Sequence, residues 1–301
     1  MTQQPSGVLI LNKDEGHTSS YFVGRIKKKF HFKKVGHGGT LDPMATGVLP
    51  ICVNDATKLA GYILNSDKVY EGKFVLGTET DTHDLTGKIL HQEENVQVNE
   101  KAICEAMEKL TGTIEQVPPM FSAIKYNGTP LYKLARRNEV VERKPRQIQI
   151  YAFEFKGIEK KIEISFRVHC SKGVYVRTLC YDVGKILGTG ASLKSLVRTQ
   201  TGAFKIEDAA PFEALTQETF TQGPAWKSLG DILKMFPFQV IPTLLSKKIR
   251  NGYIPKFYEV STKPDLREVP MGVFLDDHQK PLALVSPDIG RQAFKLLRVF
   301  S

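Results

Sequence analysis

Apolar and polar residues alternate with two different periods along the chain, and the change of period predicts a mixture of strands and helices. Residues 8–13 (VLILNK) form a short apolar run that is typical of a buried strand. Residues 69–77 alternate with period two, which predicts a strand with its even-numbered side chains on one face. Further strands are expected at 147–155 and 161–170, where the same alternation recurs.

Apolar residues at helical spacing predict two helices in the first half of the chain. The first has Thr18 or Ser19 as its cap and continues to about Phe30. The second begins after Asn99 and ends at Gly112.

A third helix is predicted after a turn at 171–173. Its apolar face is expected to consist of Val176, Leu179, Cys180, Val183, Ile186 and Leu187. Arg177 then lies close to a junction between a strand and a helix, a position from which it can reach across a cleft in the sheet.

The composition changes twice, and both changes predict boundaries. Residues 114–147 are rich in proline and basic side chains, so we expect a mobile surface insertion rather than core. Residues 241–301 hold short strand-like pieces separated by Pro, Gly and Asp, which predict a small β-rich domain: 271–275, 281–285 and 294–299. The expected fold class is therefore α+β, with a larger domain at 1–240.

The charge balance favours a polyanionic partner. The 301 residues carry a net charge of +10, with a pI near 9.3, and basic side chains that replace counterions on phosphates bind nucleic acid. Residues 16–41 contain no acid and six clustered basic side chains: Arg25, Lys27, Lys28, Lys29, Lys33 and Lys34. They form either an RNA-binding surface or a solvated helix face. A membrane partner is not expected, because no apolar run approaches ~20 residues and the N-terminus does not resemble a signal peptide.

The cysteines and histidines do not predict a metal site. The four cysteines form no CxxC pair, and the seven histidines are scattered. Reduced thiols and a cytoplasmic location are the expectation.

The most informative segment is GHGGTLDPMATGVLP at residues 36–50. Asp42 is the first acid after Glu15, and it lies among glycines that let a backbone turn sharply. Pro43 fixes its own φ and favours an extended conformation at Asp42. The loop either presents a reacting carboxylate or is a Gly-rich turn whose Asp hydrogen-bonds its own backbone.

This segment resembles the catalytic-loop signature of the pseudouridine synthases, and specifically of the bacterial TruB family that modifies tRNA. Further blocks follow the family's order over roughly the first 240 residues: LNKDEGHTS (11–19), ATKLA (56–60), YEGKFVLGTETDTHDLTG (70–87), QVPPMFSAIKYNGTPLYKLAR (116–136), CSKGVYVRTLCYDVG (170–184) and LVRTQTGAF (196–204). Several ordered blocks of this length are a specific signal.

The resemblance implies a mixed-sheet catalytic domain, an RNA-binding insertion at 114–147 and a PUA-like RNA-binding domain at 241–301. It implies isomerisation of uridine to pseudouridine at position 55 in the T-loop of tRNA, by base flipping. The expected partner is the tRNA T-arm, the protein is expected to be a monomer, and the family needs neither a cofactor nor a metal.

The resemblance also assigns the reacting groups. Asp42 acts at the nucleoside as a nucleophile or as a base on the sugar, and Arg177 keeps it ionised. Arg177 has two alternative roles, a phosphate contact or an ion pair with Asp182. Tyr70 stacks on the flipped base and moves a proton at C5; otherwise it is a half-buried strand residue.

The remaining assignments concern the substrate pocket. Tyr175 and Leu196 form its walls, although core packing also explains Leu196. His37 fills the space left by the flipped base, or is a turn residue.

Three further residues carry assignments of a supporting kind. Asp84 anchors the flipped state and Arg177, and its segment lacks the EF-hand spacing that calcium ligation requires. Lys13 and Lys58 contact phosphate or the scaffold.

Two patterns suggest other functions but are incomplete. Residues 122–125 match S-x-x-K without the S-D-N or K-T-G partners of serine acylases, and GHGGTLDP lacks the Lys-Ser/Thr ending of a P-loop.

A non-catalytic tRNA-binding or RNA-folding protein is the main alternative function. Loss of Asp42, Tyr70 or Arg177 would favour it, and all three are present.

Overall fold

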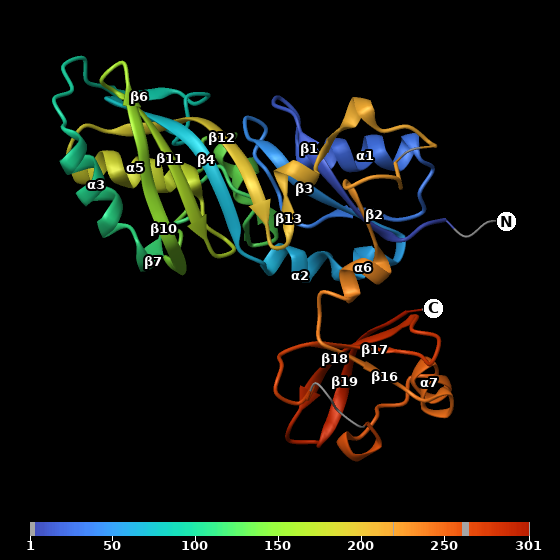
Figure 1. The fold of residues 1–301 in the computed structure, drawn as a ribbon. Coiled ribbons are helices and arrows are strands. Elements are labelled where there is room, and N and C mark those ends of the chain that lie inside the picture. Colours follow the sequence, from blue (N-terminus) through green and yellow to red (C-terminus); the bar gives the residue numbers. More distant parts are fainter. Residues whose placement is uncertain (1–3, 219, 261–264, 301) are drawn as a thin grey trace.

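The computed structural model describes residues 4–218, 220–260 and 265–300, which form one long twisted sheet and a smaller lobe below it (Figure 1). The strands of the long sheet are β1 (Gly7–Lys13), β2 (Val35–His37), β3 (Thr46–Val53), β4 (Lys68–Leu76), β7 (Gly112–Gln116), β10 (Arg146–Glu159), β11 (Glu163–Cys170), β12 (Ala191–Thr201), β13 (Phe204–Lys205), β14 (Ala210–Pro211) and β15 (Trp226–Ser228). Two short hairpins pair β5 (Thr78–Thr80) with β6 (Ile89–Gln92), and β8 (Lys125–Tyr126) with β9 (Thr129–Pro130).

The long sheet is mixed. Its strand order is β14-β1-β3-β12-β4-β11-β10-β7, with β15, β2 and β13 paired to β1, β3 and β12. Most neighbours are antiparallel, but β1 runs parallel to β14 and β3 runs parallel to β12. The predicted α+β class is confirmed.

The helices are α1 (Ser19–Lys29), α2 (Ala60–Asn65), α3 (Glu100–Lys109), α4 (Leu131–Ala135), α5 (Val176–Leu187), α6 (Leu229–Leu233) and α7 (Thr243–Arg250), with short 3-10 helices at Asn54–Leu59, Ile206–Asp208, Phe212–Ala214 and Phe257–Glu259. Both predicted caps form: Thr18 accepts the N–H of Tyr21, and Asn99 accepts that of Ala102. None of the described helices is long and apolar enough to cross a membrane.

The main core lies between the sheet and helices α1, α3 and α5, and α3 and α5 cover one face of the sheet (Figure 1). As the period of β4 predicts, Tyr70, Phe74 and Leu76 are buried on this face. Ile186 departs from the predicted apolar face of α5, because its side chain is 41% exposed. The opposite face of the sheet carries a solvent-accessible row of ion pairs across β4, β11 and β10.

The predicted insertion is shorter than the composition suggests. Gln116 pairs with Arg146, so residues 114–116 and 146–147 are strands of the sheet, and the insertion spans 117–145. Three buried side chains form a small cluster of its own: Met120, Leu131 and Leu134. The prolines and basic side chains of this segment mask the short strand that precedes them.

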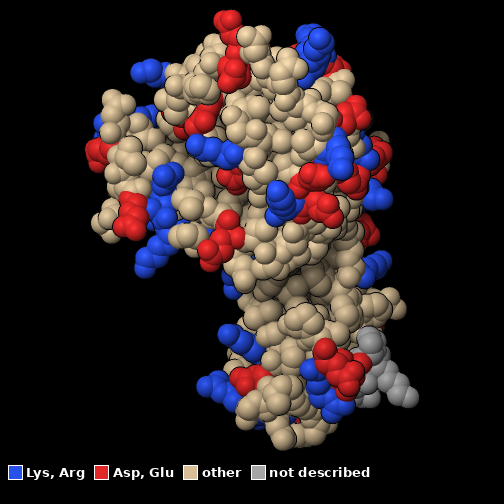
Figure 2. Space-filling view, turned by 90° about the vertical axis from the view of Figure 1, so that its left-hand side faces the viewer, with Lys and Arg blue, Asp and Glu red and all other residues tan. Residues whose placement is uncertain are grey.

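The smaller lobe contains β16 (Phe238–Val240), β17 (Gly272–Leu275), β18 (Pro281–Asp288) and β19 (Ala293–Val299) in that order. Because Phe238 pairs with Val273, this sheet begins three residues before the predicted boundary at 241. The lobe packs beneath β1 and β3 through an apolar cluster that includes Phe300, and Figure 2 shows a mostly uncharged waist at this junction.

Candidate active site

Asp42 lies on the loop between β2 and β3. Side chains from elsewhere in the fold bind the backbone of this loop on both sides of Asp42. Ser19 Oγ accepts the N–H of Leu41 at 2.8 Å. Lys13 Nζ donates to the carbonyls of Ala45 at 2.6 Å and Pro43 at 3.1 Å. Lys13 is therefore a scaffold contact, and burial lowers its pKa to about 8.

Arg198 on β12 holds the same loop from the other side. It is 1% exposed, and its guanidinium donates to the carbonyls of Val48 at 2.8 Å, Gly39 at 3.1 Å and Thr40 at 3.2 Å. Arg198 was not among the residues predicted from the sequence, although it lies within the matching block 196–204. Its residue type gave no signal of burial, and the flanking Val197 and Thr199 are only partly buried.

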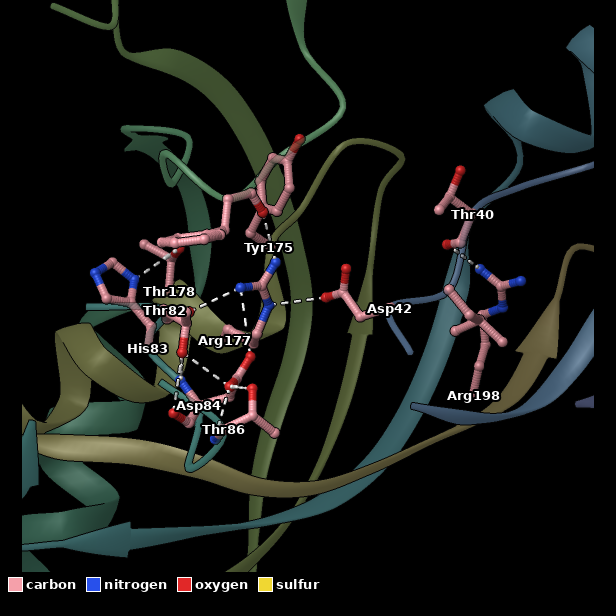
Figure 3. A network of polar contacts seen from close by, with 12 residues as sticks. Thr40, Asp42, Thr82, His83, Asp84, Thr86, Tyr175, Arg177, Thr178 and Arg198 are labelled. Carbon is pink, nitrogen blue, oxygen red and sulfur yellow. Dashed lines mark hydrogen bonds and ion pairs between the residues drawn. The ribbon is translucent and has the colours of Figure 1, made fainter. Parts of the chain in front are cut away.

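Arg177 approaches Asp42 from the first turn of α5, opposite Arg198 (Figure 3). Its Nε lies 2.8 Å from Asp42 Oδ2, and its Nη1 lies 3.5 Å from Asp84 Oδ2. The remaining donors reach the carbonyls of Thr82 at 2.7 Å and Phe121 at 3.0 Å. The described ion pairs of Arg177 are with Asp42 and Asp84, so the alternative pair with Asp182 is not formed.

The two acids of Arg177 have different surroundings. The Asp84 side chain is 6% exposed, and its Oδ1 accepts from Thr82 Oγ1 at 2.9 Å and from the Thr86 N–H at 3.0 Å. The Asp42 side chain is 39% exposed. Asp84 is therefore fixed within its turn, whereas Asp42 is oriented by Arg177 and still faces open space.

His83 completes this turn and was missed by the sequence analysis. Its ring stacks on Tyr181 with centroids 4.1 Å apart, and Nδ1 lies 3.3 Å from Thr178 Oγ1. Burial, helped by the nearby charge of Arg177, lowers the pKa of His83 to about 4. A neutral ring therefore packs beside the cation.

The structure brings Tyr70 and Tyr175 near Asp42. Tyr70 is 9% exposed on β4; burial raises the pKa of its hydroxyl, and Arg198 opposes that rise. Burial also raises the pKa of Tyr175, and the charge of Asp42 contributes to the shift of both tyrosines. The side chain of Gln116 holds the backbone of Tyr175: the Tyr175 N–H donates a 2.8 Å hydrogen bond to Gln116 Oε1.

The other predicted site residues lie in different settings. Leu196 belongs to the main core and pairs with Gly72. His37 is half-buried at the end of β2; burial lowers its pKa, and its buried Nδ1 has no hydrogen-bond partner among the described residues.

Lys58 lies outside this group. It pairs with Asp55 at 2.7 Å and donates to the Val299 carbonyl at 3.1 Å, so it joins the smaller lobe to the larger body. All four cysteines are free. Within the described ranges, no three His, Cys, Asp or Glu side chains are grouped as metal ligands would be.

Comparison with known proteins places this site in a family. Residues 27–176 match the N-terminal domain of the TruB family pseudouridylate synthases, and residues 177–234 match the tRNA pseudouridylate synthase B C-terminal domain. A tRNA pseudouridine synthase B from Syntrophotalea carbinolica is 37% identical over 98% of both chains. The chain belongs to the TruB family. A Clostridium perfringens member of the same name is 42% identical over 82% of this chain and 83% of its own.

A solved structure agrees with this assignment. A chain of the structure described as "Crystal Structure of a Cbf5-Nop10-Gar1 Complex" superimposes with a TM-score of 0.76 at 25% identity, over 98% of this chain and 85% of the other. The two TruB family matches meet between Val176 and Arg177, within the site. The second match ends at 234, before the small lobe, whose PUA-like character stays a prediction.

Proposed function

We propose that this TruB family enzyme forms pseudouridine at position 55 in the T-loop of tRNA, and that Asp42 is its reacting carboxylate. Membership of the family makes the chain an isomerase that converts uridine to pseudouridine in tRNA. The choice of the T-loop uridine rests on the resemblance of the matching blocks.

One observation carries the assignment of Asp42: a buried cation orients a carboxylate that still faces solvent. Arg177 Nε donates to Asp42 Oδ2 at 2.8 Å, while the Asp42 side chain remains 39% exposed. A charge-assisted bond of this geometry fixes the orientation of the carboxylate. Asp42 therefore has a fixed orientation and an accessible face for a nucleoside.

The chemistry follows from this arrangement. The N-glycosidic bond of uridine breaks, the detached uracil rotates, and a bond forms between its C5 and the sugar. Ionised Asp42 acts at the sugar, either by attacking carbon or by accepting a proton. Tyr70 would stack on the flipped base and exchange the C5 proton through its hydroxyl, while Tyr175 and Leu196 would line the pocket.

The basic side chains near the loop supply affinity for the phosphates. Lys27, Lys28 and Lys33 are exposed, and the described ion pairs of α1 involve Arg25 alone, with Glu213. Exposed cations without acidic neighbours are available to replace counterions on RNA. Their contacts offset the few kcal/mol that base flipping costs.

The test is position-resolved pseudouridine mapping of a tRNA transcript by chemical labelling and mass spectrometry. We expect modification at position 55 with the wild-type chain and none with Asp42→Asn, since an amide neither attacks as an anion nor accepts the proton. Asp14→Asn, a change at an exposed acid in the adjoining turn, is the matched control and should retain activity. Modification at another position would refute the T-loop assignment, and turnover by pure Asp42→Asn would refute the role of Asp42.

A further inference from the structure

We propose that Arg198 is a positioning residue that fixes the Asp42 loop and Tyr70 relative to one another. This inference rests on the roles proposed above for Asp42 and Tyr70. Arg198 binds the loop and lies beside Tyr70 in the sheet, and it is almost wholly shielded from solvent, at 1% exposure.

The sheet places Arg198 between the two segments. Strand β12 lies between β3 and β4, and the backbone of Arg198 is paired with Gly47 on one side and Tyr70 on the other. A Cβ at Gly47 would lie 2.3 Å from the Arg198 carbonyl, so only glycine admits this close approach.

The side chain then ties together both ends of the loop. Nη1 and Nη2 bind the carbonyls of Thr40 and Gly39, before Asp42, while Nε binds that of Val48, after it. A planar guanidinium directs these donors in fixed directions. Arg198 therefore fixes both ends of the loop between Gly39 and Val48, while Ser19 and Lys13 hold the segment between them.

The charge of Arg198 reaches the neighbouring titratable groups. None of the ion pairs formed by the described residues includes Arg198. A buried cation is costly unless it is well hydrogen-bonded, and the three carbonyls supply those hydrogen bonds. Arg198 contributes to the lowered pKa of Lys13 and His37, and through its charge and a hydrogen bond it opposes the raised pKa of Tyr70. Arg198 therefore links Tyr70 to the loop that carries Asp42, because it interacts with both.

Single-turnover kinetics of Arg198→Lys and Arg198→Met test the inference, with Arg167→Lys on the solvent-accessible face of the sheet as the matched control. A shift of about 1 Å in the reacting groups can cost about 100-fold in rate, so we expect a loss of that order for both Arg198 variants. The tRNA Kd should change by less than about threefold, because phosphate contacts dominate affinity. Arg167→Lys should leave both quantities unchanged.

A second readout reports on Tyr70 directly. In protein labelled with 3-fluorotyrosine, the fluorine resonance of Tyr70 is assigned by its loss in Tyr70→Phe and followed against pH. In Arg198→Met the Tyr70 hydroxyl should titrate at higher pH than in the wild type, because the opposing cation is gone. A merely structural role would leave this titration unchanged.

The outcomes separate this inference from the proposed function. If Asp42→Asn is inactive while Arg198→Lys reacts at the wild-type rate, Arg198 has no positioning role and the function stands. A rise in Kd that matches the loss of rate would place Arg198 in RNA binding instead. If both Arg198 variants fail to fold, Gly39→Ala decides, since its Cβ would lie 3.4 Å from Nη1 and its backbone φ is +147°; a wild-type rate there overturns the proposal.

Discussion

Two buried arginines flank Asp42 and differ in what they bind. Arg177, in the first turn of α5, pairs with two carboxylates and two carbonyls. Arg198, on a central strand, binds three carbonyls. Figure 3 shows the two guanidiniums on opposite sides of the Asp42 loop.

The difference separates two uses of the same side chain. A cation at a helix N-terminus is disfavoured by the helix dipole, so Arg177 needs the compensation that Asp42 and Asp84 provide. Arg198 lies on a strand, where this penalty is absent, and its carbonyl partners belong to the path of a loop. Charge compensation dominates at the first arginine, and directional hydrogen bonding dominates at the second.

The largest expected effect comes from changing the charge-compensating arginine. Arg177→Lys should lower the single-turnover rate by at least ~100-fold, about 2.7 kcal/mol, because lysine cannot reproduce the planar contacts to Asp42, Thr82 and Phe121. The Kd for tRNA should change only a few-fold. A near-normal rate with weakened affinity would show that Arg177 contacts phosphate instead.

The same measurement sharpens the comparison when methionine is included. Arg177→Met should be slower than Arg177→Lys by about tenfold, since lysine keeps a charge beside two acids. At Arg198 the lysine and methionine variants should differ by less than about threefold, because no acid among the residues that the structure describes pairs with Arg198. If the methionine variant were slower than the lysine variant by the same factor at both positions, the two arginines would not differ in their need for charge compensation.

The next effect concerns stability against pH in the turn beside Arg177. The pKa of His83 falls from 6.5 to about 4 on folding, so the unfolded chain binds more protons between these values. Stability is therefore lost as pH falls from 6.5 to 4, by about 2 kcal/mol after allowance for partial exposure. Chemical denaturation across this range should show that slope, and His83→Gln should flatten it; an unchanged slope would contradict the assignment.

A smaller loss is expected from the second acid of Arg177. Asp84→Asn places an amide 3.5 Å from Nη1 in place of a carboxylate, and it should reduce the single-turnover rate by about tenfold, near 1.4 kcal/mol. Asp81→Asn, at an exposed acid of the same turn, is the control. A rate equal to that of the control would show that Asp42 alone compensates Arg177.

The smallest effect on rate is expected away from both arginines. Reversing Lys27, Lys28 and Lys33 to Glu should weaken tRNA binding and lower the salt dependence of log K by about 0.7 to 0.9 per lost phosphate contact. The rate at saturating tRNA should fall much less, because these side chains position the RNA without touching the base. An unchanged salt slope would identify a merely solvated helix face.

Much of the fold could be predicted because local patterns determine it. The period of β4 predicted the buried face that carries Tyr70, and the caps of α1 and α3 followed from Thr18 and Asn99. The edges of the insertion could not be placed, because Gln116 is assigned to a strand only by its partner Arg146, 30 residues away. Such pairing is a tertiary property that composition does not record.

The site shows the same division. The glycine-rich loop and the matching blocks pointed to Asp42 and Arg177, and the structure pairs these two residues. Arg198 and His83 were missed because their surroundings arise from distant segments: carbonyls of the Asp42 loop for one, and α5 for the other. Their residue types alone carry no signal of burial or of partner.

The docking of the small lobe has a consequence for synthesis of the chain. Val8 and Ile10 share an apolar cluster with Phe300, so the first strand awaits partners translated about 290 residues later. At about 5 to 20 residues per second, that delay lasts about 15 to 60 s. During this interval the nascent polypeptide exposes apolar surface. We therefore expect chaperones that bind chains during translation to bind it.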